Sequence, residues 1–88
     1  MKVWIDQDLC TGDGLCEEIA PDVFWMDDDG LAYVREAADH FGEEKKFGPS
    51  QGLAGGAEGL ARVPSGQEEA TIESAEECPG ECIFIEID

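Results

Sequence analysis

Four cysteines lie in two short stretches near opposite ends of this 88-residue chain. The chain reads CTGDGLC over residues 10–16 and CPGEC over residues 78–82. In the first stretch Cys10, Asp13 and Cys16 are spaced by three, so one tight loop turns three side chains inward, and the intervening glycines let backbone N–H groups approach what lies inside. If both stretches serve one site, the fold has to bring the two ends of the chain together.

This pattern of cysteines predicts an iron-sulfur site. A cube of iron and sulfide needs ligands at three or four corners, and a loop of seven residues does not reach every corner. One ligand must therefore come from elsewhere, and Cys78, which is followed by Pro79, is the candidate. Because Pro79 has no N–H and blocks continuation of a helix, the chain has to turn where Cys78 is presented.

Three other chemistries fit the cysteines less well. A structural zinc site pairs ligands two to four residues apart, whereas five residues separate Cys10 from Cys16. A disulfide framework requires an oxidising compartment, for which the sequence carries no signal. A thiol catalyst needs a partnered base, and the one histidine, His40, adjoins a loop-rich segment. A non-redox acidic interaction module, stapled by zinc or disulfides, stays open as the alternative function.

The length of the chain predicts one domain, residues 1–88, with a small core. A chain this short buries only about 60% of its unfolded surface, so a staple such as a metal site is expected. An acid, Asp6, follows after only five residues, so we expect no signal segment and no membrane span. These features predict a cytoplasmic protein, in which cysteines bind metal more often than they form disulfides.

The net charge of −17 comes from 22 acidic residues against five basic ones. Such a chain is repelled by phosphates, which excludes nucleic acid as a partner. A basic protein surface is the natural complement, because opposite charge speeds encounter and keeps binding salt-dependent and brief. The charge is also compatible with a role in solubility alone.

Hydrophobic patterning predicts two small antiparallel pairs of strands. Residues 2–6 alternate as a short strand and residues 83–87 have the same character, so the two ends of the chain are expected to pair. Residues 23–26 and 31–34 are apolar runs separated by three aspartates and Gly30, which predicts a hairpin. The core is expected to include four aromatic residues, namely Trp4, Phe24, Trp25 and Phe84.

Two short helices are expected beside these strands. The first covers residues 15–20 and follows the cysteine loop directly. The second begins at Ser65-Gly66-Gln67-Glu68, which has the form of a capping box, and runs to about residue 77. Ile72 and Ala75 give this second helix a narrow apolar stripe, and the helix ends by delivering Cys78 to the site.

Between these elements, about residues 36–64, the periodicity fades. Frequent glycines predict a loop-rich insertion with one helical turn near residues 36–41. Five apolar residues are expected to pin parts of it against the body: Phe41, Phe47, Leu53, Leu60 and Val63.

The CxxDxxC motif of residues 10–16, with the remote cysteine-proline pair at 78–79, resembles the single-cluster, low-molecular-weight bacterial-type ferredoxins. It is most similar to the subgroup in which aspartate replaces the second cluster cysteine. The resemblance covers about residues 1–35 and 65–88, and the insertion has no counterpart in the shortest members. It implies a small α+β ferredoxin fold with two short antiparallel β pairs, two short helices and a loop-rich insertion.

The resemblance implies that Cys10, Cys16 and Cys78 bind the cluster, with Asp13 as a conditional fourth ligand. A carboxylate holds cluster iron more weakly than a thiolate does, so the iron capped by Asp13 is expected to be labile. We therefore expect a 4Fe-4S cluster under anaerobic reducing conditions and a 3Fe-4S cluster after oxidation, although a permanent three-iron cluster beside a solvated Asp13 stays open. Cys82 is expected to be a buried free thiol.

The resemblance also implies a one-electron carrier that is not itself an enzyme and acts as a monomer. The expected partners are basic surfaces of a ferredoxin reductase and of an electron-accepting oxidoreductase, such as a haem-thiolate monooxygenase. These partners rest on the resemblance alone.

Overall fold

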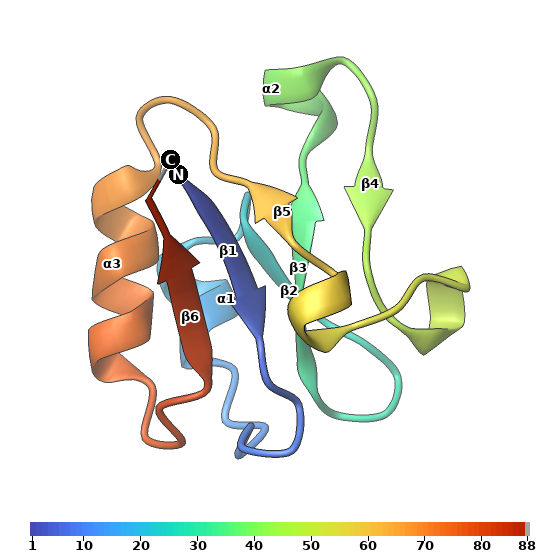
Figure 1. Cartoon of the computed structure of the whole chain (residues 1–88), viewed down its shortest axis with the longest axis vertical. Coiled ribbons are helices and arrows are strands. Elements are labelled where there is room, and N and C mark those ends of the chain that lie inside the picture. The colour runs from blue at the N-terminus through green and yellow to red at the C-terminus, as the bar shows by residue number, and fades with distance from the viewer. Residues whose placement is uncertain (88) are drawn as a thin grey trace.

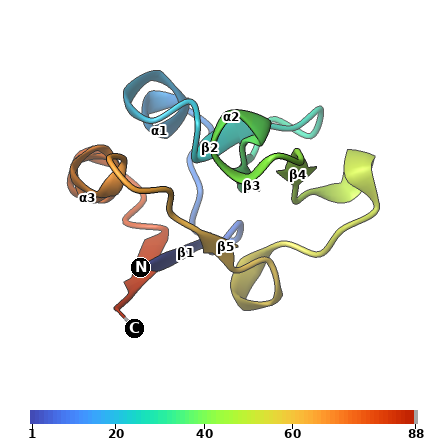
Figure 2. The ribbon, with the colours of Figure 1, turned by 90° about the horizontal axis from the view of Figure 1, so that it is seen from above.

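Two small antiparallel sheets face each other, and two helices close one side of the space between them (Figures 1 and 2). The computed structural model describes residues 1–87. One sheet has the strand order β5-β1-β6 and the other β2-β3-β4. In chain order the elements are β1 (Lys2–Ile5), α1 (Leu15–Ile19), β2 (Phe24–Met26), β3 (Ala32–Glu36), α2 (Ala38–Phe41), β4 (Lys45–Lys46), η1 (Pro49–Gln51), η2 (Gly56–Glu58), β5 (Ala61–Arg62), α3 (Glu68–Glu77) and β6 (Ile83–Glu86).

The first and last strands pair antiparallel, as the sequence predicts. Val3 lies opposite Ile85 and Ile5 opposite Ile83, so β1 and β6 turn alternate residues to the same face. The ladder continues beyond the strands, because the backbone N–H of Asp6 donates to the carbonyl of Cys82 at 2.8 Å. The predicted hairpin of β2 and β3 is also present, with Phe24 opposite Val34. The α+β class is therefore confirmed.

The segment expected to be mostly loop supplies a third strand to each sheet. The β4 strand pairs with β3 at Arg35 and Lys46, and β5 pairs with β1 at Lys2 and Arg62. The helical turn expected near residues 36–41 is α2, so the described residues hold three α-helices rather than two. Strands of two residues are too short for an alternating pattern, which is why the sequence did not indicate them.

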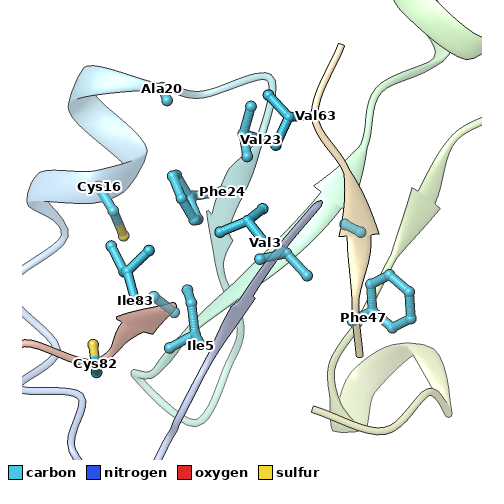
Figure 3. Packing of buried hydrophobic residues seen from close by; sticks show 13 residues of the cluster. Val3, Ile5, Cys16, Ala20, Val23, Phe24, Phe47, Val63, Cys82 and Ile83 are labelled. Carbon is cyan, nitrogen blue, oxygen red and sulfur yellow. The ribbon is translucent and has the colours of Figure 1, made fainter. Parts of the chain in front are cut away.

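The core lies between the sheets (Figure 3). Val3, Ile5 and Phe24 are fully buried, and Phe47 and Val63 bring the insertion against them, as expected. Leu53 differs from expectation, because it is 39% exposed. Of the four aromatics expected in the core, only Phe24 belongs to it. Trp25 is half-buried outside the core cluster, and Trp4 and Phe84 stack on the outer face of β1 and β6 with their ring centroids 4.6 Å apart.

Helix α3 packs through small residues, and only part of the predicted apolar stripe is buried, because Ala75 packs against the core whereas Ile72 does not. Ile72 is 41% exposed, while Thr71 and Ser74 are fully buried. Their hydroxyls donate to backbone carbonyls four residues earlier, at 2.8 Å in both cases, so burial leaves no polar atom unpaired. The capping box also differs, because Gln67 rather than Ser65 occupies the N-cap position.

An ion pair with a buried carboxylate and an exposed guanidinium joins the two sheets. The Glu36 carboxylate at the end of β3 accepts the backbone N–H of Arg62 on β5 at 2.9 Å, and the Arg62 guanidinium donates to both carboxylate oxygens at 3.0 and 3.2 Å. Burial acts to raise the pKa of Glu36, but the hydrogen bonds and charge of Arg62 outweigh it and lower the pKa. The carboxylate is therefore ionised at neutral pH.

We expect Glu36→Gln to lower the free energy of unfolding by about 1–3 kcal/mol at pH 7. A neutral amide at this buried position cannot form the charge-assisted hydrogen bonds that the Glu36 carboxylate accepts from Arg62. The lowered pKa makes this stabilisation present above the ordinary carboxyl pKa of about 4.3 and lost as the pH falls through the lower folded value. The difference from wild type, measured by denaturant unfolding, should therefore shrink below about pH 4.

Glu44→Gln is the matched control for this experiment. Glu44 also receives two guanidinium bonds, from Arg35 at 2.6 and 2.9 Å, but the pair is exposed. We expect Glu44→Gln to cost at most about 1 kcal/mol. Equal losses in the two variants would contradict the role assigned to the Glu36 pair.

Candidate metal centre

Cys10 is positioned by a tight turn at the end of β1. The backbone N–H of Leu9 donates to the carbonyl of Asp6 at 3.0 Å, and that of Cys10 donates to the carbonyl of Gln7 at 3.3 Å. The Cys10 thiol is half-buried, and its sulfur accepts the backbone N–H of Ala32 on β3 at 3.5 Å. Such N–H donors stabilise negative charge on sulfur.

Cys16 lies on the buried face of the short helix α1, where it is 7% exposed. Gly14 precedes the helix in the left-handed conformation, with φ 78°, and lets the chain turn from loop into helix. Figure 3 shows Cys16 pointing from α1 toward Ile83, on the same side of the core as Cys82. The side chain therefore enters the space into which the C-terminal cysteine stretch leads.

Cys78 follows the last residue of α3. Its backbone N–H donates to the backbone carbonyl of Ser74 at 3.1 Å, which fixes its position at the end of the helix. The chain then turns, with the N–H of Glu81 donating to the carbonyl of Cys78 at 3.1 Å, and it enters β6 through Cys82. The turn leaves Cys82 1% exposed, which confirms the expectation of a buried thiol. Its sulfur lies 3.3 Å from that of Cys78, and both thiols are free.

Glycine allows the two cysteine stretches to approach closely. A Cβ atom at Gly80 would lie 2.3 Å from the carbonyl oxygen of Leu9 and 3.3 Å from the methyl carbon of Thr11. A Cβ atom at Gly12 would lie 2.7 Å from the carbonyl oxygen of Gly30 in the β2–β3 turn. No other residue type fits these contacts without a shift of the backbone.

The thiols are close enough to influence one another electrostatically. Burial, and then the neighbouring thiols of Cys10 and Cys78, raise the pKa of Cys16 to about 12. Burial, and then contacts with Cys78 and Cys10, also raise the pKa of Cys82. Thiolates crowded in this way require compensating positive charge, which bound iron supplies. Free thiols from both ends of the chain, close-approach glycines and an N–H donor to sulfur therefore fit an iron-sulfur cluster.

Asp13 has a local role in the loop. Its side chain is exposed, and its two carboxylate oxygens accept hydrogen bonds from the Thr11 hydroxyl at 3.0 Å and from the backbone N–H of Leu15 at 3.2 Å. The second bond places an acid at the start of α1, where it satisfies an otherwise free N–H. Both carboxylate oxygens of Asp13 thus already have partners within the loop, which would compete with a metal for the side chain.

Sequence reasoning missed two contributors to the site. The N–H of Ala32 is a backbone group, and no residue type marks it. The crowding at Gly80 depends on Leu9, which lies far away in sequence. Among residues 1–87, no three cysteine, histidine or acidic side chains converge as closely as a single metal ion requires.

The chain matches a family model described as a 4Fe-4S single cluster domain over residues 3–85. A ferredoxin of Bacillus subtilis strain 168 is 32% identical over 81 residues, which is 92% of this chain and 77% of that protein. A ferredoxin of Thermococcus litoralis is 62% identical over 32 residues, 36% of this chain and 54% of that protein. The chain thus spans about half the length of several curated relatives it matches.

Two solved structures share the fold. The crystal structure of a 3Fe-4S ferredoxin associated with CYP194A4 from R. palustris HaA2 has a TM-score of 0.67 and 26% identity, with 100% of both chains covered. Wild-type Hydrogenobacter thermophilus ferredoxin 1 has a TM-score of 0.68 and 28% identity, with 98% of this chain and 97% of that chain covered. In residues 1–87, no helix is long and apolar enough to cross a membrane.

We expect Gly80→Ala to reduce iron incorporation, because the added methyl group collides with the backbone of Leu9 and separates the two cysteine stretches. The collision should also lower the stability of the apoprotein by about 1–3 kcal/mol. The measurement is iron per protein after anaerobic reconstitution, with Glu77→Ala, an exposed change three residues earlier, as control. Full incorporation in Gly80→Ala would show that the close approach is not needed.

Proposed function

Because the chain belongs to the family of single-cluster 4Fe-4S ferredoxins, we propose that it carries single electrons on one iron-sulfur cluster. The observation that supports this most directly is the meeting of free thiols from opposite ends of the chain, with family similarity across residues 3–85. Ferredoxins transfer electrons between other proteins, and we propose that this chain is likewise a carrier and not an enzyme.

In this proposal the cluster ligands are Cys10, Cys16 and Cys78. The cluster, when bound, supplies one-electron redox chemistry at a potential that the protein tunes. The chain provides that tuning through the N–H of Ala32, which stabilises negative charge on the Cys10 sulfur, and through the burial of Cys16, which keeps water away. Cys82 packs beside Cys78 as a small apolar residue.

Asp13 determines the number of irons in this proposal. As a ligand it would hold a fourth, labile iron, because a carboxylate is a poorer ligand for cluster iron than a thiolate. Its present hydrogen bonds to Thr11 and Leu15 compete with that role. We propose that the four-iron form prevails under anaerobic reducing conditions and that oxidation releases the iron bound by Asp13.

The proposed partners are a ferredoxin reductase as electron donor and a haem-thiolate monooxygenase as acceptor. The structural relative associated with CYP194A4 supports such an acceptor. The net charge of −17 supports brief docking on basic partner surfaces. We further propose that residues 1–88 act as one monomeric cytoplasmic domain, in which the insertion of about residues 36–64 completes both sheets.

We expect anaerobically purified protein to contain four irons and four sulfides, and EPR to show a three-iron signal after oxidation. Asp13→Cys should retain the fourth iron through oxidation, because a thiolate holds it more firmly. Asp28→Cys, which adds a cysteine at another exposed acidic turn position, should behave as wild type. If wild type binds no iron and sulfide, the proposed function is wrong; if only Asp13→Cys gains the fourth iron, Asp13 is not a ligand.

The adjacent sulfurs of Cys78 and Cys82 allow a paired test of the ligand assignment. We expect Cys82→Ala to assemble a cluster with the wild-type iron content, because that thiol only fills space. Cys78→Ala should lose cluster assembly or most of its iron. Iron and sulfide analysis with visible absorption measures both variants. Loss of the cluster in Cys82→Ala, with normal assembly in Cys78→Ala, would exchange the two roles.

A further inference from the structure

A hollow of about 390 Å³ opens beside the turn that carries Cys10. One wall is that turn, with Asp6 and Asp8, and the other is the insertion, with Leu53 and Ala54. Tyr33, a nearly buried residue of β3, lies in the lining between them. The roles assigned above to the cysteines and to the sheet-completing strands do not use this feature.

Specific contacts hold the two walls together. The Gln7 side chain donates to the carbonyl of Ala32 at 3.0 Å and accepts the backbone N–H of Gly56 at 2.8 Å, so one amide joins β3 to the insertion. A Cβ atom at Gly55 would lie 2.5 Å from the Gln7 side-chain oxygen and 2.9 Å from the Tyr33 ring. The hollow is therefore a built part of the fold rather than a gap between loose loops.

The charge of the lining selects a cationic occupant. Asp6 and Asp8 both belong to the lining, and no lysine or arginine does. The two arginines of the chain lie elsewhere, where Arg35 pairs with Glu44 and Arg62 pairs with Glu36. The whole chain adds a net charge of −17, so a positive group is drawn toward this surface. The aliphatic stem of a lysine or arginine also matches the apolar side chain of Leu53.

The shape favours a side chain of another protein over a free small molecule. Small-molecule sites enclose most of their ligand within mainly apolar walls. This hollow is open to solvent, and acidic residues, Asp6 and Asp8, line it beside apolar Leu53 and Ala54. The wall with Asp6 and Asp8 belongs to the turn that ends at the proposed ligand Cys10. The backbone N–H of Cys10 donates to the carbonyl of Gln7 in this turn at 3.3 Å.

We propose that this hollow receives a lysine or arginine side chain of the redox partner and so docks the partner beside the Cys10 turn. The inference rests on the proposed electron-carrier function, because it names the surface through which that function is exercised. The insertion then has a second role besides completing the sheets, since residues 49–56 form one wall of the docking site.

The test uses cytochrome c, a basic redox protein, as the probe, with its affinity for the purified cluster-containing protein measured by calorimetry at low salt. Asp8→Lys should weaken binding by about tenfold more than Glu73→Lys. Both substitutions change the net charge by the same amount, but Glu73 is an exposed residue of α3 and does not line the hollow. Equal weakening would mean that overall charge, and not the hollow, guides docking, and would overturn the proposal.

A second pair of variants separates the hollow from its charge. Ala54→Trp fills the hollow, whereas Ala57→Trp places the same ring on an exposed alanine of η2 outside the lining. We expect severalfold weaker cytochrome c binding for Ala54→Trp alone, with thermal stability and iron content unchanged in both. Equal affinity in the two variants would contradict the proposal, as would self-association of wild type that Ala54→Trp abolishes.

The binding measurement does not require electron transfer, so a failure of the docking proposal can be distinguished from a failure of the electron-carrier function. If the protein binds no iron and sulfide, the electron-carrier function is wrong, and docking of a redox partner at the hollow is overturned with it. If the protein holds its cluster and, once reduced with dithionite and freed of the excess, reduces cytochrome c at the same rate in all four variants, the carrier function stands and the hollow is not the docking site.

Discussion

The antiparallel pairing of β1 with β6 is the constraint on which the rest of the structure depends. Each strand adjoins one cysteine stretch, and the bond from the N–H of Asp6 to the carbonyl of Cys82 extends the ladder to the edge of the site. Joining positions so far apart in sequence costs chain entropy before any contact forms. Cluster binding stabilises the same arrangement of the two chain ends, because the proposed ligands come from both cysteine stretches. Pairing of the termini and assembly of the metal site are therefore expected to be mutually stabilising.

The insertion strengthens this arrangement at points far from the cysteines. It completes both sheets, and the Glu36–Arg62 pair ties β3 to β5 across them. In the turn between β2 and β3, the Asp27 carboxylate accepts the backbone N–H of Asp28 at 2.7 Å and that of Ser50, in the insertion, at 3.1 Å. Burial acts to raise the pKa of Asp27, but the bonds from Ser50 and Asp28 outweigh it and lower the pKa. Buried acids in this acidic protein thus serve as hydrogen-bond acceptors that fasten loops.

Sequence reasoning was most successful where local patterns and chemistry agreed. Alternation at the chain ends predicted β1 and β6, and the acidic turn before Gly30 predicted the hairpin. It was less successful where a contact depends on tertiary packing. Ile72 was expected to be buried, but the interior face of α3 is made by Thr71 and Ser74, whose hydroxyls bond to their own helix. The motif indicated the cysteines of the candidate site, whereas the N–H of Ala32 became visible only in the fold.

The small buried face of α3 also explains how the site is closed. Helices α1 and α3 run side by side along the same flank of the core (Figure 2), and α3 ends at Cys78 while α1 carries Cys16. Large side chains between two helices hold their axes farther apart. Thr71 and Ser74 are the fully buried residues of α3, and their bonds to backbone carbonyls remove the cost of burying a hydroxyl. A larger apolar side chain at either buried position would overpack the interior and shift the helix that ends at Cys78. Small hydroxyl residues therefore keep the end of α3 in place at the cost of some hydrophobic burial.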